Sequence, residues 1–509
     1  MNVLQTKLNR MHRQKVVIIG SGLGGLSCGV ILAKNGYEVL VLEQARQIGG
    51  CLQCFTRHGV KFETGMHFIG SASEGQTINK LMRYLEIEGR VKLSPLDPDR
   101  YDVVGLNGKK YKFPMGKEAF ITRMSEYFPG QADNIARYYE LIEKIANASP
   151  LKSLQAKDNG DGLLTTYQLK SVNEVIDSII TDPLLSKVLA GNLPLYAAEA
   201  DKTPFSTHAF IMDFYNSSAY RVVGGSDCVA EALRDTIVRY GGQVVAGSRV
   251  TKIVCDGEKA VGVEVKDEEF IPCDYILSDA HPVRTLELLD TDMIRRAFRK
   301  RINSIPQTVG CFSVYLHFKE NTLPYMNYNY YGYNTDTPWG CENYTDEDWP
   351  KGFLYMHFCH EYSPRYGQTG VILSYMRMEE VERWRGTQVG HRGQEYEQLK
   401  RRKAEQLISS LGNHCPETVG NIAHYYTSTP LTYLDYTGTV DGSMYGNAKD
   451  ISSGAAGRVP HRTKIPNLFQ TGQNINSHGM LGVMVGTIVT CGELVGAETI
   501  YRQIKEANL

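Results

Sequence analysis

The sequence has no long apolar run and no excess of charge of either sign. Its longest apolar stretch, from Gly479 to Gly492, spans 14 residues and is broken by glycines, whereas a membrane-spanning helix needs about 20 residues. The formal net charge of -1 gives no overall attraction to nucleic acid. Residues 1–15 are polar and basic and lack the apolar segment of a secretory signal. We therefore predict a cytoplasmic protein that does not bind nucleic acid, with peripheral membrane contact as an open alternative.

The cysteines and histidines of the sequence do not follow the spacing of a disulfide framework or of a known metal-binding motif. The 11 cysteines are odd in number and irregularly spaced, so they do not form the framework of a disulfide-rich secreted protein. His357 and His360 lack the H-E-x-x-H order of zinc enzymes, and we predict no metal site. No internal repeat is visible, and 509 residues are enough for two domains or more.

Residues 16–50 hold the most informative pattern of the chain. After the apolar strand VVIIG, the residues Gly20, Gly22 and Gly25 form G-x-G-x-x-G at the start of a helix. Such glycines allow a tight turn, close approach of the backbone to a pyrophosphate and close packing of the helix on the sheet. The unpaired N–H groups and the positive dipole at the helix start favour phosphate. The pattern predicts a dinucleotide site.

Glu43 selects among the dinucleotides. It ends the second strand, YEVLVLE, where a carboxylate can accept both ribose hydroxyls and repels a 2′-phosphate. FAD or NAD therefore fits and NADP does not. In Glu43-x5-Gly49-Gly50 the glycine pair lets the chain pass close to the cofactor, and this extended pattern resembles the fingerprint of FAD oxidoreductases of the amine-oxidase and phytoene-desaturase type. FAD is thus the predicted cofactor.

The next stretch, GGCLQCFTRHGVKFETGMHFIG, narrows the resemblance. Cys51 stands where the broad group has arginine, and FETGMHFIG resembles the corresponding stretch of all-trans-retinol 13,14-reductases (retinol saturases). The chain is thus similar to the FAD-dependent family of phytoene desaturases, carotenoid isomerases and retinol saturases, with the bacterial retinol-saturase-like proteins nearest.

Two later blocks carry the same resemblance. Residues 220–265 predict a Gly-Gly turn, an amphipathic helix over about 228–240 and strands around Val244, Val250 and Val263. Residues 463–500 predict a strand, a polar loop and a glycine-rich helix, and Gln473 stands there where the wider group has an acid. The resemblance implies cofactor contacts from Gly20, Gly22, Leu23, Gly25, Glu43, Gln44, Gly50, Cys51, Val250, Gly472, Gln473, Gly482, Val483 and Met484.

The three cofactor blocks are far apart in the sequence, which predicts a discontinuous domain. We expect an α/β fold in which residues 1–80, 215–300 and 425–509 form a Rossmann-like FAD-binding domain of the amine-oxidase and phytoene-desaturase type. The inserts 81–214 and 301–424 then form an α+β substrate domain. Residues 325–366 are dense in aromatics, which suits strands and either a core or the walls of a tunnel for a long apolar substrate.

The resemblance implies an FAD-dependent oxidoreductase that saturates or desaturates a carbon-carbon bond of a lipophilic isoprenoid or polyene, such as a retinoid or carotenoid. FAD carries the hydride, and NAD(P)H is a candidate transient electron donor. His67, Tyr445 and His478 lie in flavin-adjacent blocks and are the candidates to supply or remove a proton. The oligomeric state is not predicted.

Three other functions stay open: a redox-neutral cis-trans polyene isomerase, an amine or other C–N oxidase, and a flavin-binding protein without turnover. Cys51 and Cys54 form C-x-x-C beside the flavin motif, which suggests a redox dithiol. We favour two reduced packing cysteines instead, because the chain has no second G-x-G-x-x-G for NADPH and flavin disulfide reductases use a longer spacing.

The basic runs 295–301 and 400–403 are either solvated helix faces or a site of contact with anionic lipid.

Overall fold

The computed structural model describes residues 13–154, 162–266, 270–475 and 477–509. The first 12 residues, which hold most of the segment considered for a targeting signal, lie outside these ranges. Within them, no helix combines the length and the apolar character needed to cross a bilayer.

The strand before the glycine fingerprint, β1 (Lys15–Ile19), is the central strand of a five-stranded parallel sheet. Val16 and Ile18 pack toward one face and Val17 and Ile19 toward the other, because side chains alternate along a strand. A sheet covered on both faces explains why this strand is apolar throughout. The spatial order is β10 (Gln243–Ala246), β2 (Glu38–Glu43), β1, β14 (Tyr275–Ser278) and β20 (Leu468–Gln470).

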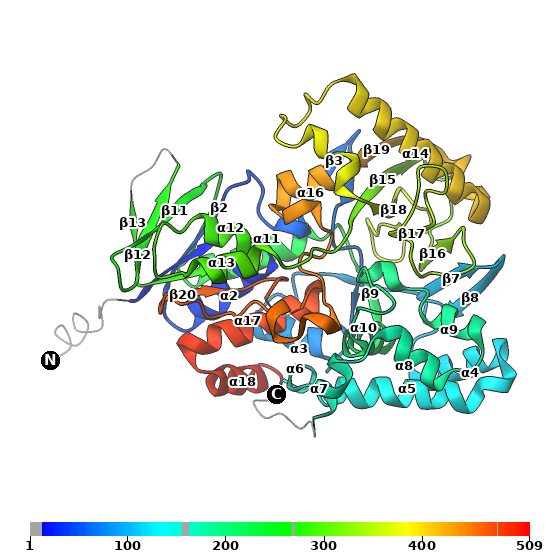
Figure 1. Cartoon of the computed structure of the whole chain (residues 1–509), viewed down its shortest axis with the longest axis horizontal. Coiled ribbons are helices and arrows are strands. Elements are labelled where there is room, and N and C mark those ends of the chain that lie inside the picture. The colour runs from blue at the N-terminus through cyan, green and yellow to red at the C-terminus, as the bar shows by residue number, and fades with distance from the viewer. Residues whose placement is uncertain (1–12, 155–161, 267–269, 476) are drawn as a thin grey trace.

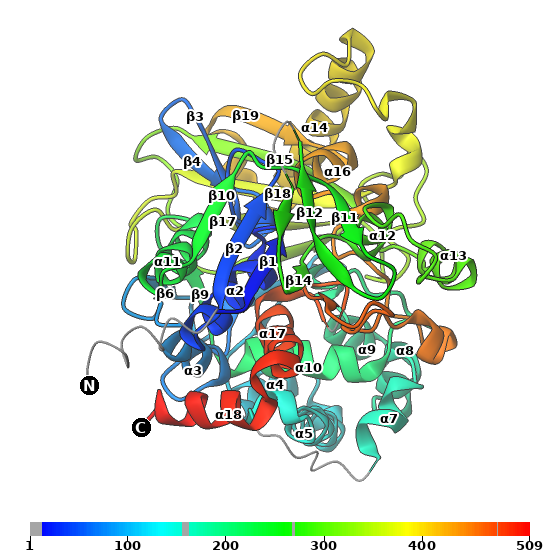
Figure 2. The ribbon, with the colours of Figure 1, turned by 90° about the vertical axis from the view of Figure 1, so that its left-hand side faces the viewer.

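Helices cover one face of this sheet (Figure 2). α2 (Leu23–Lys34) packs against α11 (Asp227–Arg239) and α17 (Gly479–Val495), and the three share an apolar cluster with Val16 and Ile18. α3 (Thr77–Tyr84) and α18 (Ala497–Glu506) extend this layer. The predicted helices after the second Gly-Gly turn and after Gly472 are confirmed as α11 and α17.

A small antiparallel sheet covers the opposite face. It contains β11 (Val250–Cys255), β12 (Ala260–Val265) and β13 (Ile271–Pro272), whose Ile253 and Val263 pack on Val17 and Ile19. α12 (Pro282–Glu287) and α13 (Arg296–Asn303) contribute Leu286 and Ile302 to the same cluster. The resulting three layers bring the carboxyl ends of the parallel strands to one edge, where α/β sheets bind ligands.

Strands from two distant parts of the chain share a seven-stranded sheet, at the upper right of Figure 1. Neighbouring strands run antiparallel, except that β16 and β7 are parallel. The spatial order is β19 (Ile422–Ser428), β15 (Gly310–Phe318), β18 (Thr369–Met376), β17 (Gly352–His357), β16 (Asn329–Tyr333), β7 (Asp102–Leu106) and β8 (Lys109–Phe113).

Helices surround this sheet and share its core. α14 (Gln394–His414) packs on β15, β18 and β19, and α16 (Pro430–Thr437) packs on β15. The other helices of this half are α4 (Lys117–Tyr127), α5 (Ala132–Asn147), α6 (Pro150–Ser153), α7 (Leu163–Gln168), α8 (Val172–Ile179), α9 (Pro183–Leu189), α10 (Phe205–Ser217) and α15 (Pro416–Val419).

Two small sheets complete the fold. The hairpin of β3 (Cys54–Arg57) and β4 (Val60–Glu63) precedes residues 64–68, and β5 (Ile69–Gly70) then pairs with β9 (Ala219–Val222), which also pairs with β6 (Leu93–Pro95). Short 3₁₀ turns are η1 (Gly50–Leu52), η2 (Pro129–Gln131), η3 (Leu193–Leu195), η4 (Met378–Glu380), η5 (Glu382–Trp384), η6 (Val440–Gly442) and η7 (Ile451–Gly457).

The aromatic block 325–366 forms strands, as expected, but its aromatic side chains do not line a tunnel. β16 and β17 are buried along their whole length, and Tyr330, Tyr331, Tyr333 and Tyr355 belong to the core. Successive side chains of a strand point to opposite faces, so this complete burial means that both faces of β16 and β17 are covered. Of the two alternatives for the aromatic side chains, core holds for these four, whereas Leu354 and Met356 of the same block line the cavity described below.

Candidate cofactor and substrate site

The glycine turn has the geometry that its spacing predicts. Gly20 adopts a φ of 97°, a conformation that favours glycine, and its N–H donates to the carbonyl of Leu42 at 2.9 Å. A Cβ on Gly25 would lie 2.1 Å from the carbonyl oxygen of Gly20, so the close packing of α2 on β1 requires glycine there. Gly22 caps α2 without a side chain and lines a cavity. The N–H groups at this helix start face the cavity edge, where the carboxyl group of Asp279 lies against Gly22 and Gly25.

Glu43 lies buried beside this turn, at the end of β2. Its Oε2 accepts hydrogen bonds from the Ser21 N–H at 2.9 Å and the Ser21 hydroxyl at 2.7 Å, and its Oε1 accepts from the Ala45 N–H at 2.8 Å. The carboxylate also lines the cavity, and its two oxygens offer about four acceptor positions in all. It therefore has acceptor capacity left for the hydroxyls of a ribose.

The cavity at this edge is continuous and has a volume of about 1550 Å³. It runs from the glycine turn and Val250, past Cys51 and the start of α17, to Leu354, Met356 and Leu373 on the seven-stranded sheet. Ligand pockets usually measure roughly 300–1,000 Å³. The cavity therefore has room for a dinucleotide and for a second molecule beside it.

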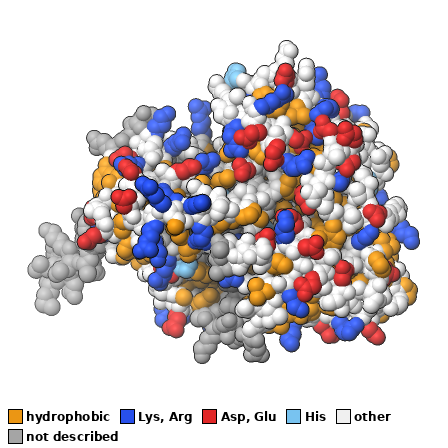
Figure 3. Space-filling model, viewed as in Figure 1, with side chains coloured by type: hydrophobic (Ala, Val, Ile, Leu, Met, Phe, Trp, Pro, Cys, Tyr) orange, Lys and Arg blue, Asp and Glu red, His pale blue; other side chains and the backbone are white. Residues whose placement is uncertain are grey.

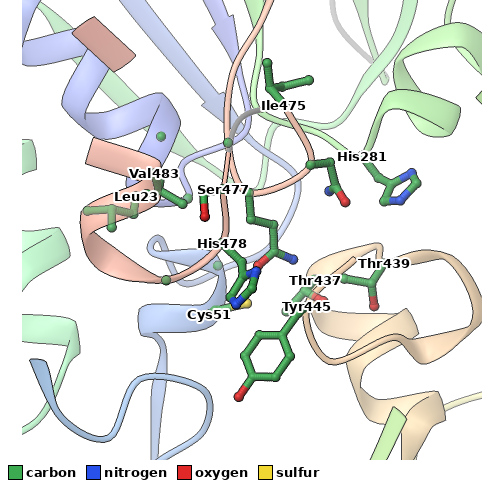
Figure 4. Close-up of a pocket in the computed structure, with 18 of the residues that line it drawn as sticks. Leu23, Cys51, His281, Thr437, Thr439, Tyr445, Ile475, Ser477, His478 and Val483 are labelled. Atoms are coloured by element: carbon green, nitrogen blue, oxygen red, sulfur yellow. The ribbon is translucent and has the colours of Figure 1, made fainter. Parts of the chain in front are cut away.

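The middle section joins residues that are hundreds of positions apart in the sequence. Figure 4 shows the side chains of Cys51, Tyr445 and His478 next to one another, with Leu23 and Val483 in the same pocket. The rings of Tyr445 and His478 are tilted against each other with centroids 4.8 Å apart. This section has a partly apolar lining suited to a flavin ring system, and it belongs to the same cavity as the glycine turn.

Most residues predicted to contact the cofactor line this one cavity. They are Gly20, Gly22, Leu23, Glu43, Gln44, Gly50, Cys51, Val250, Gly472, Gln473, Gly482 and Val483, and the proton-transfer candidates His67, Tyr445 and His478 line it as well. Gly25 and Met484 do not. Gly25 packs α2 on β1, and Met484 is buried in the apolar cluster of α2, α11 and α17. The side chain of Met484 lies on the core side of α17, whereas its neighbour Val483 lies on the cavity side, so the contact predicted for Met484 stays a prediction that its side chain does not support.

His67 has a carboxyl group behind it that the sequence analysis missed. Its Nδ1 lies 3.9 Å from Oε2 of Glu63, and neither atom has a hydrogen-bond partner among the described residues. Burial, and then Arg221, lowers the pKa of His67 to about 3, whereas burial raises the pKa of Glu63 to about 8 against the opposing charge of Arg221. At neutral pH the pair is therefore uncharged, with one proton on the Glu63 carboxyl group and one on the neutral imidazole of His67.

Arg221 is the buried cation of this region. Its guanidinium donates to the carbonyl oxygens of His67 at 3.1 Å and Tyr328 at 3.3 Å, and its Nε has no partner among the described residues. Its charge opposes the burial that raises the pKa values of Glu63 and of Asp102. A carboxylate formed on Glu63 would thus have a nearby positive charge.

Tyr445 and His478 differ from His67 because no carboxyl group among the described residues is paired with either side chain. The Tyr445 hydroxyl donates to the carbonyl of Pro194 at 3.1 Å, and burial raises the pKa of this phenol. Burial, and then the charge of Lys449, lowers the pKa of His478 to about 3. Both side chains are neutral in the working pH range.

Cys51 and Cys54 are free thiols in different surroundings. Cys51 lines the cavity, whereas Cys54 is buried and its sulfur lies 3.6 Å from the Ser226 hydroxyl. Burial raises the pKa of Cys51 to about 11 and that of Cys54 to about 12. Thiolates are the reactive form, so these surroundings oppose dithiol exchange.

Asp279 is a further cavity residue that the sequence analysis missed. It follows β14 directly, at the carboxyl edge of the parallel sheet. The signal was present in the sequence: an acid after an apolar strand, YILSD, in a chain with a dinucleotide fingerprint. Glu63 offered a weaker signal, because only the tertiary structure places its oxygen against His67.

A second cavity, of about 560 Å³, adjoins the first. The two share Cys51 and Tyr433 in their walls. Three exposed apolar side chains, Val389, Tyr425 and Tyr436, line it, together with the exposed cations Arg57 and Arg401. The smaller cavity therefore combines apolar and basic groups and leads toward Cys51.

The two basic runs differ from a simple surface patch. In 400–403, Lys403 is fully buried and pairs with Asp346 and Glu380, and Lys400 pairs with Glu397. In 295–301, Arg299 donates to the carbonyl oxygens of Leu286 and Leu289. Lys and Arg side chains do gather where Figure 1 places α12 and α13 (Figure 3).

Comparison with known proteins places this geometry among flavoenzymes. The flavin containing amine oxidoreductase family matches residues 23–490. The all-trans-retinol 13,14-reductase of Rattus norvegicus is 30% identical, over 96% of this chain and 86% of that protein. Prolycopene isomerase 2 of an Oncidium hybrid cultivar is 24% identical, over 97% of this chain and 85% of that protein. The crystal structure of an oxidoreductase from Methanosarcina mazei superposes with a TM-score of 0.63 at 16% identity, over 93% of this chain and 99% of that one. The family resemblance and the fold class predicted from the sequence are confirmed.

Proposed function

The chain belongs to the family of flavin-containing amine oxidoreductases, and on this premise we propose that it is an FAD-dependent enzyme that saturates or desaturates a carbon-carbon bond of a lipophilic isoprenoid or polyene. The single observation that supports this best is the continuous cavity, which joins the ribose carboxylate Glu43 to an apolar section on the seven-stranded sheet. The 30% identity to an all-trans-retinol 13,14-reductase makes retinoids and carotenoids the first substrates to test.

The residues around the glycine turn fit FAD. Gly22 and Gly24 line the cavity at the helix start, where they would face the pyrophosphate, Glu43 would accept the ribose hydroxyls, and Gly472 and Val483 would flank the flavin ring system. When bound, FAD supplies the two-electron hydride chemistry. We propose that residues 1–80, 215–300 and 425–509 form the FAD domain and that 81–214 and 301–424 form the substrate domain.

We assign the proton transfer to His67. The imidazole lines the cavity, and the position of Nδ1 against Glu63 leaves Nε2 as the nitrogen available to a bound molecule. The Nε2–H protonates one substrate carbon, Glu63 returns a proton to Nδ1, and Arg221 stabilises the carboxylate that remains. The same groups accept a proton in the desaturating direction. Tyr445 and His478 shape the flavin section instead: the Pro194 carbonyl engages the phenol proton of Tyr445, and His478 has no paired carboxyl group among the described residues to return a proton to it.

The smaller cavity is the proposed access route for the substrate. Its apolar and basic groups suit contact with an anionic lipid surface, from which an insoluble polyene can be collected. The passage past Cys51 and Tyr433 would then deliver the substrate to the flavin section. Peripheral membrane contact on this side is therefore part of the proposal.

A redox-neutral cis-trans isomerase is the second candidate. The 24% identity to a prolycopene isomerase over nearly the whole chain favours it specifically. An isomerase would use the same cofactor and the same apolar section, and the substrate would leave with an unchanged mass.

The decisive experiment weighs the products. Purified protein loaded with FAD is incubated anaerobically with retinoids, carotenoids and other isoprenoids, in parallel with dithionite, with NADH or NADPH, and without reductant. Gain or loss of two hydrogens supports the oxidoreductase, an isomer of equal mass supports the isomerase, and no change with any substrate contradicts both. Comparison of the reductants tests NAD(P)H as the electron donor.

A further inference from the structure

Asp279 lies at the position where the glycine turn and α2 are closest to the end of β14. Its backbone N–H donates to the carbonyl of Ile19 at 2.8 Å, which fixes the residue directly beside the end of β1. Its side chain lines the large cavity. An acidic group therefore occupies the part of the site that is built for phosphate.

Three glycines leave the space that the Asp279 carboxyl group fills. A Cβ would lie 2.5 Å from Oδ2 of Asp279 if added to Gly22, 2.4 Å from Oδ1 if added to Gly24, and 2.5 Å from Oδ1 if added to Gly472. Gly22 and Gly24 have ordinary negative φ values, so backbone conformation alone does not require glycine at either position. A side chain at either position would displace the Asp279 carboxyl group, and at Gly24 it would also meet the backbone of Gly472 at 3.0 Å.

The surroundings of Asp279 disfavour an ionised carboxyl group there, and a bound pyrophosphate would disfavour it further. Burial raises the pKa of Asp279 to about 7; the N–H groups of Gly25 and Gly22 oppose this shift, and the charge of Glu43 adds to it. The titratable groups that face it are Glu43 from β2 and the Cys51 thiol from η1. His281, two residues further along, instead receives the N–H of Val283 and contacts Gln307. No cation of the described residues contributes to the shift.

We propose that Asp279 is a proton-linked determinant of FAD affinity: its carboxyl group lies in the pyrophosphate cradle and carries a proton whenever FAD is bound. The inference rests on the proposed FAD site. A carboxylate and a pyrophosphate at one helix start repel each other, whereas a protonated Asp279 removes the repulsion and donates a hydrogen bond.

The proposal fixes the sign of the pH dependence. A pyrophosphate beside Asp279 favours its protonated form, so FAD raises the pKa of Asp279 further. FAD binding then leaves the proton count unchanged at low pH and takes up a proton from solvent once the pH exceeds the value of about 7. Above that pH the affinity falls by up to about tenfold per pH unit, the limit for one linked proton.

The test compares flavin-free wild-type protein with Asp279→Asn and Asp274→Asn. Asn has nearly the same shape as Asp but does not titrate. Asp274 is the matched control, because it precedes the same strand at its opposite end and accepts from the Lys15 N–H outside the cavity. Quenching of flavin fluorescence gives the FAD Kd from about pH 6 to pH 9, and calorimetry in buffers of different ionisation enthalpy counts the protons taken up.

We expect wild-type protein and Asp274→Asn to lose affinity above about pH 7 and to take up close to one proton per FAD. Asp279→Asn should bind FAD with a Kd that is independent of pH, at least about tenfold tighter than wild type at the alkaline end, and without proton uptake. Equal pH slopes or equal proton uptake in wild type and Asp279→Asn would overturn the inference alone. Absence of FAD binding at every pH would overturn the proposed cofactor, and this inference with it.

Discussion

Ser21 donates two hydrogen bonds to the carboxyl group of Glu43, one from its backbone N–H and one from its hydroxyl, at 2.9 and 2.7 Å. The acid that we propose binds the ribose is thereby tied to the turn that we propose binds the pyrophosphate, 22 positions earlier in the chain. The Ser21 hydroxyl also accepts from the Gly49 N–H at 3.2 Å. One small network therefore sets the positions of β2, the glycine turn and the Gly49–Gly50 segment together.

Glu43→Gln should weaken FAD binding without unfolding the protein. The amide keeps the shape but loses the charge-assisted hydrogen bonds, which are worth about 1.5–3 kcal/mol. This corresponds to a roughly ten- to hundredfold higher Kd, measured by quenching of flavin fluorescence. Glu38→Gln is the control, because Glu38 is an exposed residue at the start of the same strand. Unchanged affinity in Glu43→Gln would contradict the ribose assignment.

The elements around the predicted dinucleotide site could be predicted because the sequence patterns that specify them lie within short segments of the chain. The strand, turn, helix and acid of residues 16–43 follow one another directly, and each has its own backbone requirement. The later helices α11 and α17 could be located by periodicity and by glycines. The strand predicted within residues 463–500 is confirmed as β20, but the sequence does not show that its three residues pair with β14 at the edge of the parallel sheet.

The features that were missed depend on tertiary neighbours. The sequence does not show that Glu63 faces His67, because the register of a short hairpin and the following turn sets that contact. The aromatic block left core and tunnel wall open, because a strand buried on both faces and a tunnel wall have the same composition. The sequence also does not show that Val483 lines the cavity while the next residue of α17, Met484, packs in the apolar cluster.

Replacing Cys51 and Cys54 by serine should leave catalysis largely intact. Burial raises both thiol pKa values, so little thiolate exists at neutral pH to exchange electrons with a flavin. We expect the rate of flavin reduction, followed by stopped-flow absorbance, to stay within about tenfold of wild type, or 1.4 kcal/mol of barrier. Cys228→Ser serves as the single-cysteine control outside the cavity. A loss of several orders of magnitude with FAD still bound would restore the dithiol mechanism.

Glu63→Gln should change how stability depends on pH. Because burial raises the pKa of Glu63 to about 8, the folded state binds this proton more tightly than the unfolded state does. Stability linked to Glu63 is thus lost as the pH rises from about 4.5 to about 8, at up to about 1.4 kcal/mol per unit. Glu63→Gln should gain stability relative to wild type across this range, as chemical denaturation would show, whereas the exposed Glu74→Gln should not. Parallel curves for wild type and Glu63→Gln would contradict the raised pKa.

The same variant should also lose turnover in the saturating direction. Gln cannot return a proton to His67, and a general acid contributes about 10²- to 10⁴-fold to a rate. In wild type we expect kcat to fall as the pH rises through about 8, when Glu63 ionises, and this step should be absent from Glu63→Gln. The comparison uses the substrate found by product mass. If Glu63→Gln keeps the wild-type rate and pH profile, His67 does not draw its proton from Glu63.

The final prediction concerns how an insoluble substrate reaches the cavity. Val389, Tyr425 and Tyr436 are 45%, 37% and 51% exposed at the smaller cavity, with Arg57 and Arg401 beside them. Apolar insertion combined with about 1 kcal/mol for each cation near anionic lipid gives reversible, salt-sensitive binding. We therefore expect partial sedimentation with anionic liposomes at low salt, and its loss at high salt.

Three sets of substitutions distinguish membrane contact at the rim of the smaller cavity from contact at the basic residues of 295–301. Tyr425→Ser with Tyr436→Ser, and Arg57→Gln with Arg401→Gln, should each reduce sedimentation. Substitution of the exposed Arg295, Arg296 and Lys300 by Gln should leave most of it. If only the substitutions in 295–301 reduce sedimentation, the protein contacts the membrane through the region of α13, which is one of the two basic runs considered in the sequence analysis. Protein that stays in the supernatant at low salt would instead mean that the substrate arrives by another route, and that the apolar rim must be explained by a contact other than lipid.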